Sequence, residues 1–232
     1  MDKELNEIDK WKTLRLKLSK DYAYNNEWEE AIQLFSARLE RKFFSPVQTI
    51  IDSQRLEGEG FSIVTVQCSL IEMLSAFRLG KIYNHKLKDE SPAFEYKESR
   101  KMFTNFLKTV NIFKDIFWKQ DGTEPPFSAN DFYASVRCGL MHEARTKNNW
   151  FISATPKMLK VKTDLFFIQK RGEQKIIYRT ILHYRLKNYL EVYQNELRTT
   201  NDEGIILRKY LARKMDHLFE IPINEEFDWW NE

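Results

Sequence analysis

The sequence has 232 residues, of which 42% are hydrophobic and 14% aromatic, so it can bury a sizeable core and general disorder is excluded. Its formal net charge of +3 is too small to identify a partner. The two cysteines, Cys68 and Cys138, lack metal-ligand spacing and make a poor disulfide framework, which favours a reducing, cytoplasmic setting. The first residues lack the apolar run of a signal peptide, and no window approaches the roughly 18 apolar residues of a spanning helix, so we expect no membrane segment.

Two amphipathic helices are predicted in the first part of the chain. The first carries an apolar stripe of Trp11, Leu14 and Leu18. The second begins near Asn26, and its stripe consists of Trp28, Ile32, Phe35, Leu39 and Phe43. A loop at Glu57-Gly58-Glu59-Gly60 follows. We therefore predict an N-terminal helical extension over residues 1–56 and a main domain over residues 57–232.

Two further helices are predicted to pack into the core of the main domain. The first has a strongly apolar face and ends near Gly80, and that face consists of Ile63, Val66, Leu70, Leu74 and Phe77. Glu72 lies on its weaker side with Cys68, where it could orient a catalytic base, pair with an arginine or simply be a surface residue. The second is one long helix, whose stripe consists of Phe103, Phe106, Val110, Phe113 and Phe117.

The next helix carries the candidate chemistry. Its core stripe is Phe132, Val136 and Leu140, and its polar side chains form one line of Asp131, Ser135, Cys138, His142 and Arg145. Arg137 and His142 are five residues apart, about 140° around a helix axis. A substrate that touches both must wrap the helix or lie where two copies of it meet. Gly139 would let a backbone or a partner helix approach closely.

Short strands are predicted after this helix, at residues 150–153, 159–168 and 175–180, with a turn at Lys170-Arg171-Gly172-Glu173. From Arg137 to Lys187 there are twelve lysines and arginines against three acids, which would attract a polyanion. The alternative is a solvated face whose acids lie elsewhere in the fold. The candidate RNA contacts are Lys147, Lys160, Lys162, Lys170 and Arg171.

Helix is predicted again in the last part of the chain. One stripe consists of Leu182, Leu186, Tyr189, Tyr193 and Leu197, and a second of Leu207, Tyr210, Leu211, Met215 and Leu218. The final ten residues are acidic and aromatic. This tail would either lie over a basic groove or form a frayed terminus.

His142 and Arg137 are the strongest candidates for catalysis. The sequence has no glycine-rich phosphate loop, no H-E-x-x-H, no G-x-S-x-G and no metal-ligand set, so we expect no metal and no cofactor. A histidine can take a proton from a hydroxyl and return it to a leaving group near neutral pH. Arginine offers a charged fork that fits phosphate oxygens. Together they suffice to cleave RNA through its own 2′-hydroxyl.

The segment Arg137-Cys138-Gly139-Leu140-Met141-His142 fits the R-x4–6-H motif and resembles the HEPN superfamily, a group of mainly helical domains with many metal-independent ribonucleases. The resemblance implies a mainly α, HEPN-like helical bundle with a small β-hairpin or three-strand insertion near residues 150–180. It also implies a homodimer whose two motifs line one cleft. Arg137 would hold the phosphate and His142 would act in proton transfer, and the auxiliary residues would be Glu72, Ser135, Cys138 and Arg145.

By the same resemblance, the chain would be an endoribonuclease, acting as a toxin or an antiviral-defence effector with an antitoxin or defence-system protein as partner. Many family members carry a polar residue, often asparagine, directly after the arginine, whereas this sequence has Cys138. Two alternatives therefore stay open. One is a catalytically inactive HEPN-like module that binds RNA or protein, and the other is an unrelated helical interaction domain.

Overall fold

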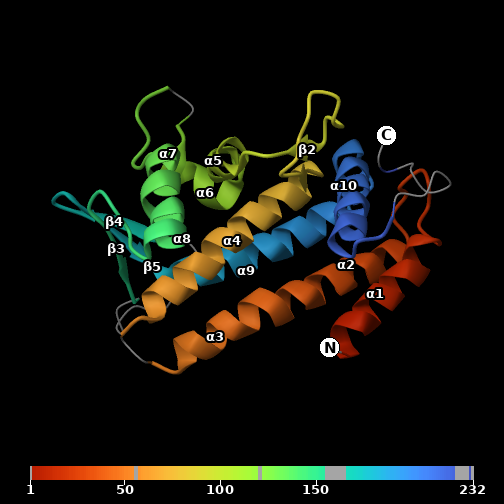
Figure 1. Cartoon of the computed structure of the whole chain (residues 1–232), viewed down its shortest axis with the longest axis horizontal. Helices are drawn as coiled ribbons and strands as arrows, with labels where there is room; N and C mark the ends of the chain where they lie inside the picture. The colour runs from red at the N-terminus through yellow and green to blue at the C-terminus, as the bar shows by residue number, and fades with distance from the viewer. Residues whose placement is uncertain (1, 55–56, 120–121, 155–165, 223–229, 231–232) are drawn as a thin grey trace. The chain divides into compact units, whose positions relative to one another are not determined.

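The computed structural model describes residues 2–54, 57–119, 122–154, 166–222 and 230, and most of them are helical (Figure 1). Strands form two small sheets, so the prediction of a mainly α fold with a small β part is confirmed. Contacts group the chain into two compact units. Unit 1 comprises Met1–Glu40, Leu74–Lys97 and Leu190–Glu232, and unit 2 comprises Arg41–Met73 and Glu98–Tyr189. The predicted division into residues 1–56 and 57–232 is a different grouping and stays a prediction.

Unit 1 is built from helices and one pair of very short strands. Its elements are α1 (Asp2–Arg15), α2 (Asn26–Leu39), the last turns of α4 (Glu59–Leu79), β1 (Ile82–Tyr83), β2 (Glu95–Tyr96), the second half of α9 (Arg179–Arg198) and α10 (Asp202–Leu218). Gly80 ends α4 in the left-handed conformation with φ +59°, as the sequence predicts. Phe35 packs on Phe77 and Tyr193, with ring centroids 4.6 and 6.1 Å away.

Unit 1 contains a buried polar cluster around Asp216. Arg15 binds both carboxylate oxygens, at 2.8 and 2.7 Å, and the indole nitrogens of Trp11 and Trp230 donate at 2.7 and 2.9 Å. Trp230 is fully buried, so the interpretation of the C-terminal residues as a frayed terminus is wrong for this residue. The other acidic and aromatic residues of this tail lie outside the described residues; they are Glu225, Glu226, Phe227, Asp228, Trp229 and Glu232.

Unit 2 contains most of the aromatic core. Its elements are α3 (Ser45–Asp52), the first turns of α4, α5 (Ser99–Thr109), α6 (Asn111–Phe117), α7 (Ala129–Phe132), the π-helical turn η2 (Tyr133–Cys138), α8 (Gly139–Glu143), β3 (Trp150–Ser153), β4 (Ile168–Arg171), β5 (Gln174–Tyr178) and the first half of α9. A second π-helical turn, η1 (Glu40–Phe44), connects α2 to α3.

Four predicted apolar stripes need correction. In two of them single residues are half-buried instead of core, namely Val66, Tyr210 and Leu218. Phe44, not Phe43, is buried after α2, because the wider π-helical turn η1 shifts the residues that face the core. The predicted long helix from Phe103 to Phe117 is two helices, since Val110 has an extended backbone (φ −76°, ψ 129°) between α5 and α6. All five residues of the stripe predicted for that long helix are nevertheless buried, because both short helices turn their apolar side inward.

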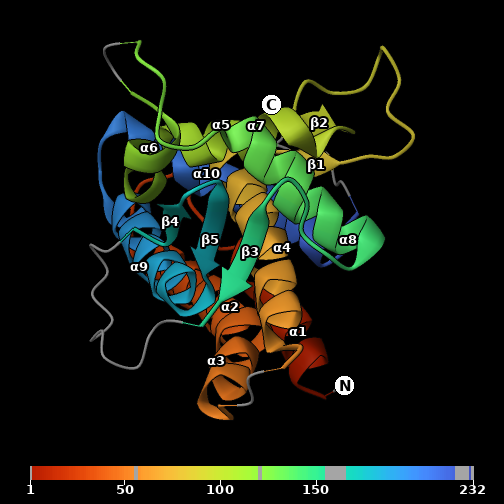
Figure 2. The same cartoon turned by 90° about the vertical axis from the view of Figure 1, so that its left-hand side faces the viewer.

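The larger sheet has the strand order β3-β5-β4, with β5 in the middle (Figure 2). β3 pairs with β5 in parallel, and β4 and β5 form an antiparallel hairpin whose turn contains Gly172 at φ +58°. The predicted strand at 150–153 is confirmed, and the predicted strand at 175–180 ends earlier, because α9 begins at Arg179. Most of the predicted strand at 159–168 lies outside the described residues, and β4 begins at Ile168.

Helix α4 is, by length and composition, apolar enough to cross a membrane, which contradicts the expectation that no segment approaches such a span. Of its most apolar window, 56% is buried inside the structure. A core helix of a soluble protein has the same length and composition, so this finding supports membrane crossing only weakly.

Candidate functional site

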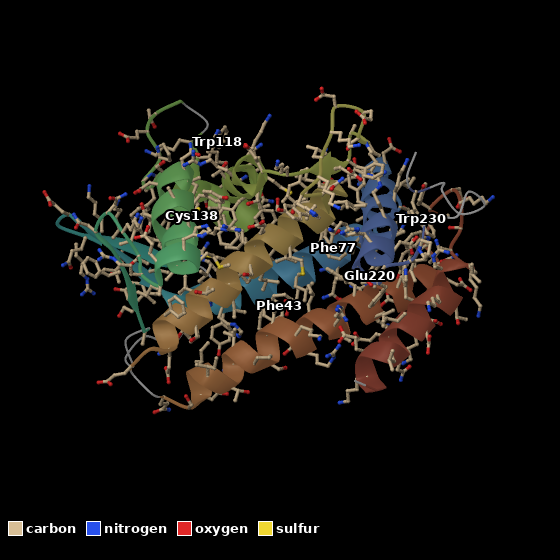
Figure 3. All side chains as sticks on the ribbon, in the orientation of Figure 1. Phe43, Phe77, Trp118, Cys138, Glu220 and Trp230 are labelled. Atoms are coloured by element: carbon tan, nitrogen blue, oxygen red, sulfur yellow. The ribbon has the colours of Figure 1, made fainter. Side chains whose placement is uncertain are left out.

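The motif segment is one run of helix formed by α7, η2 and α8, drawn in green in Figure 1 and carrying the labelled Cys138 in Figure 3. It begins at Ser128, whose side chain caps the helix by accepting a hydrogen bond from the amide of Asp131, and it ends at Ala144 with φ 54°. Phe132, Val136 and Leu140 are buried, as predicted. The π-helical turn in its middle holds Arg137, and such turns occur often at functional sites.

Arg137 is held by Glu72, which lies on α4 within the same unit. Its Nε and Nη2 donate to Oε2 of Glu72 at 3.2 and 2.9 Å, and the two side chains are 20% and 21% exposed. Burial by itself would lower the pKa of Arg137, but the charge and hydrogen bonds of Glu72 outweigh it and raise this pKa. Of the roles considered for Glu72, pairing with an arginine is therefore the one that the structure shows.

Tyr133 adds an aromatic surface beside the motif arginine. The guanidinium of Arg137 lies 5.5 Å from the ring centroid, and that of Arg100 lies 5.7 Å from it. The Tyr133 hydroxyl is 3.0 Å from the hydroxyl of Ser99 at the start of α5. Arg100 is exposed and has no carboxylate partner among the described residues. The sequence analysis missed Tyr133 and Arg100, although Tyr133 lies one helical turn before Arg137.

The two cysteines are free thiols next to the same ion pair. Burial raises the pKa of the Cys68 thiol to about 12, and the charges of Arg137, Glu72 and Cys138 act on it as smaller effects. Cys68 therefore stays protonated near neutral pH and packs as a small apolar residue. Cys138 is half-buried beside Arg137.

Ser135 and Asp131, which were predicted to lie on one polar line of the helix, belong to a structural cluster. Ser135 is buried, donates to Oδ1 of Asp131 at 2.7 Å and accepts from the Asn148 amide at 2.8 Å. Oδ2 of Asp131 accepts from the Trp150 indole at 3.0 Å and from Lys175 at 2.6 Å. Burial would raise the pKa of Asp131, but these hydrogen bonds outweigh it and lower it. The cluster ties the motif helix to β3 and β5.

His142 lies at the exposed end of α8. Within the described ranges it makes no hydrogen bond or ion pair, and the neighbouring Met141 is 48% exposed. The close approach predicted at Gly139 occurs within the chain itself, since a Cβ there would lie 2.5 Å from the carbonyl oxygen of Arg145. Arg145 lies beyond the helix, is exposed and donates weakly to the carbonyl of Thr146 at 3.4 Å.

The predicted RNA contacts have different surroundings. Lys147 forms an ion pair with Glu143 one turn earlier, whereas Lys170 is exposed on β4. Arg171 is exposed and its Nη2 donates to the Tyr178 hydroxyl at 3.0 Å. Lys160 and Lys162 lie outside the described residues. No cluster of three or more metal-ligating side chains occurs in the part of the chain that the structure describes, and the expectation of no metal and no cofactor stays a prediction.

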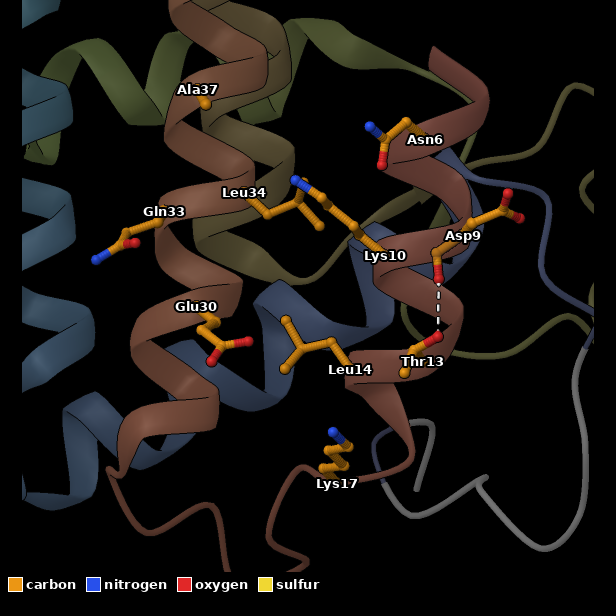
Figure 4. Close-up of a pocket in the computed structure, with 10 residues that line it drawn as sticks. All are labelled: Asn6, Asp9, Lys10, Thr13, Leu14, Lys17, Glu30, Gln33, Leu34 and Ala37. Atoms are coloured by element: carbon orange, nitrogen blue, oxygen red, sulfur yellow. Dashed lines mark hydrogen bonds between the residues drawn. The ribbon is translucent and has the colours of Figure 1, made fainter. Parts of the chain in front are cut away.

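A separate groove lies in unit 1 between α1 and α2 (Figure 4). Leu14, Leu34 and Ala37 give it an apolar lining, and Lys10 extends from α1 toward Leu34. It contains none of the predicted catalytic or RNA-binding residues. Comparisons with protein-family models, with curated proteins and with solved structures each found no match.

Proposed function

We propose that this chain is a metal-independent endoribonuclease of the HEPN type. One observation supports this most strongly: the guanidinium groups of Arg137 and Arg100 flank the ring of Tyr133, on the helix that presents His142 to solvent. Two cations around one ring favour a phosphate group, and an exposed imidazole supplies proton transfer near neutral pH.

In the proposed reaction, the 2′-hydroxyl oxygen of a nucleotide attacks its own 3′-phosphate, and the bond from phosphorus to the 5′-oxygen of the next nucleotide breaks. One imidazole accepts the proton of the 2′-hydroxyl, and an imidazolium returns a proton to the leaving 5′-oxygen. The products are a 2′,3′-cyclic phosphate and a 5′-hydroxyl. Arg137 would stabilise the charge that develops on the phosphoryl oxygens.

Arg137 is suited to this role because Glu72 fixes its orientation and takes up only some of its N–H donors. A guanidinium has five N–H donors, and Glu72 takes hydrogen bonds from only two of its nitrogens, Nε and Nη2. No hydrogen bond of Nη1 to a described residue occurs, so this nitrogen is available to a ligand. Glu72 would act as a positioning residue, since it holds the fork in one orientation.

A homodimer is part of the proposal, because Arg137 and His142 do not share one face of the helix. The exposed end of α8, with Met141 and His142, would lie near its copy so that Arg137 and His142 of different subunits contact one phosphate. In a cell, the protein would then be a cytoplasmic toxin or antiviral-defence effector that a partner protein controls.

The test is RNA cleavage in EDTA by the wild type, by His142→Ala and by His85→Ala, which removes another exposed histidine. We expect His142→Ala to lower the rate of cleavage at least about 100-fold, because it removes a general acid or base. Its unfolding free energy should change by less than about 0.5 kcal/mol, since the side chain is exposed. His85→Ala should cleave like the wild type. Equal rates for His142→Ala and the wild type would overturn the proposal.

A second candidate function is an inactive RNA- or protein-binding module. The Arg137–Glu72 ion pair favours it, because the carboxylate offsets the positive charge that a phosphate would need. This candidate predicts RNA binding that falls as the salt concentration rises, with no cleavage by the wild type.

A further inference from the structure

The three-stranded sheet of unit 2 has two chemically different faces. Strand register puts Trp150, Ile152, Ile168 and Ile177 on one of them, and three of these, Trp150, Ile168 and Ile177, are buried. This inner face packs on helices of the same unit: Trp150 contacts Phe132 edge-on at 5.4 Å, and Ile152 touches α4 at Gly60. The inner face is therefore part of the core.

The opposite face carries an exposed aromatic ring, a cation and an amide on its two edge strands, while Ile176 and Tyr178 of the central strand are buried there. Phe151 of β3 pairs with Ile176 of β5, which in turn pairs with Gln169 of β4, so the three lie in one row across the sheet. Phe151 is 47% exposed. Arg171 follows on the same face of β4, and the Tyr178 hydroxyl joins it to Gln169 by accepting from Arg171 and donating to Gln169 at 2.8 Å.

We infer that this outer face binds unpaired bases of RNA, with Phe151 as the stacking residue and Arg171 as a phosphate contact. The inference rests on the proposed function only in taking RNA as the ligand. Base-on-aromatic stacking and a cationic groove are the usual means by which proteins bind single strands. Arg171 is exposed on this face and supplies the cation that such a ligand needs, whereas Lys170 pairs with Lys175 and lies on the inner face.

The same geometry predicts a preference for single strands. The two faces of a base inside a duplex are covered by its neighbours, so Phe151 could not stack on it. Arg171 is held in place by Tyr178, which would fix the distance between the phosphate contact and the stacked base. Gln169 can both donate and accept, so it could contact the edge of a stacked base.

The experiment measures binding of a labelled unstructured RNA and of an RNA duplex by fluorescence anisotropy, with all proteins carrying His142→Ala so that the RNA stays intact. Phe151→Ala should weaken binding to the single strand about tenfold and leave binding to the duplex unchanged. Phe151→Tyr keeps the ring and should bind within about twofold of the parent. Trp118→Ala removes another exposed aromatic, 45% exposed and outside the sheet, and should have no effect.

The outcomes separate the two proposals. An unchanged single-strand affinity in Phe151→Ala, or an equal loss in Trp118→Ala, would overturn the stacking role even if the wild type cleaves RNA. A loss confined to Phe151→Ala and single strands would support it even if the wild type never cleaves. A Phe151→Leu variant, which keeps apolar bulk without a ring, should lose affinity like Phe151→Ala while its thermal midpoint stays near that of the parent. Equal affinity for single-stranded DNA would replace RNA as the ligand, and binding of neither nucleic acid would remove the role altogether.

Discussion

Two arginine–carboxylate pairs, Arg15–Asp216 in unit 1 and Arg137–Glu72 in unit 2, differ in the number of hydrogen bonds that the carboxylate accepts and in their exposure. Asp216 in unit 1 accepts four hydrogen bonds, two from Arg15 and one each from two tryptophans, and the Arg15 and Asp216 side chains are only 7% and 11% exposed. Glu72 in unit 2 accepts two, both on one oxygen, and both members of its pair are partly exposed. A saturated carboxylate fixes a fold, whereas an unsaturated pair leaves donors for a ligand.

The largest expected effect is the loss of unfolding free energy on removal of the Asp216 carboxylate. Asp216→Ala removes four buried hydrogen bonds, two from Arg15 and one from each of two indoles, so we expect the free energy of unfolding to fall by about 3–5 kcal/mol. Urea unfolding followed by tryptophan fluorescence measures this change. Asp9→Ala, which removes an exposed acid from α1, is the control and should shift the midpoint little. An Asp216→Ala midpoint equal to that of the wild type would show that the cluster is not a stabilising element.

Weakening the unsaturated pair of Arg137 and Glu72 should lower the rate of RNA cleavage without weakening RNA binding. Glu72→Gln keeps the size of the side chain and one acceptor oxygen but removes the charge, so Arg137 is held less firmly and the site loses a negative charge near the phosphate. We expect kcat for RNA cleavage to fall roughly tenfold while affinity for RNA does not fall. Asp115→Asn removes an exposed acid elsewhere in unit 2 and serves as the control. A fall in affinity that matches the fall in kcat would contradict a positioning role for Glu72.

Glu29 is a second carboxylate in unit 1 that accepts four hydrogen bonds, and its lowered pKa allows the comparison to be tested by changing the pH. Glu29 accepts hydrogen bonds from Arg198 twice, from Tyr24 and from Gln33, and the bonds from Arg198 are the main reason that its pKa lies at about 2 instead of 4.5. Because the folded-state pKa is lowered, this group stabilises the fold above pH 4.5 and loses that contribution as the pH falls toward 2.

Glu29→Gln should therefore reduce the acid sensitivity of the fold in that pH window. We expect the loss of unfolding free energy on acidification to be smaller in the variant by about 1 kcal/mol, a modest value because the pair is partly exposed and screened by solvent. Urea unfolding at pH values across the window measures it. Identical pH dependence in the variant and the wild type would show that Glu29 keeps its ordinary pKa.

Local periodicity was enough to predict most helices and much of the core. The stripe that includes Leu182, Leu186 and Tyr189 is buried as predicted, because side chains three and four residues apart share a helix face, whereas Tyr210 and Leu218 of the last stripe are half-buried. The misplacement of Phe43 and the undetected break at Val110 have a common reason. A π-helical turn and a single extended residue change the phase of a helix without changing the residue types that mark it.

The sequence was enough to select candidate site residues, but not to predict their partners from distant parts of the chain. Arg137 and His142 follow from the motif, and the exposure of His142 agrees with its position on the weaker side of an amphipathic helix. Glu72 lies 65 residues from Arg137, so no local pattern could give their pairing. Asp131 and Ser135 were predicted to share the polar line with His142, but their hydrogen bonds reach β3 and β5, and such partners depend on the tertiary fold.

The most direct test of the proposed function is the chemistry of the RNA ends after incubation of the wild-type protein with transfer RNA and total RNA in EDTA. Attack by the 2′-hydroxyl leaves a 2′,3′-cyclic phosphate on one fragment and a 5′-hydroxyl on the next, and we predict these ends. Intact RNA, or cleavage that requires a divalent metal and leaves a 3′-hydroxyl and a 5′-phosphate, would contradict catalysis by Arg137 and His142.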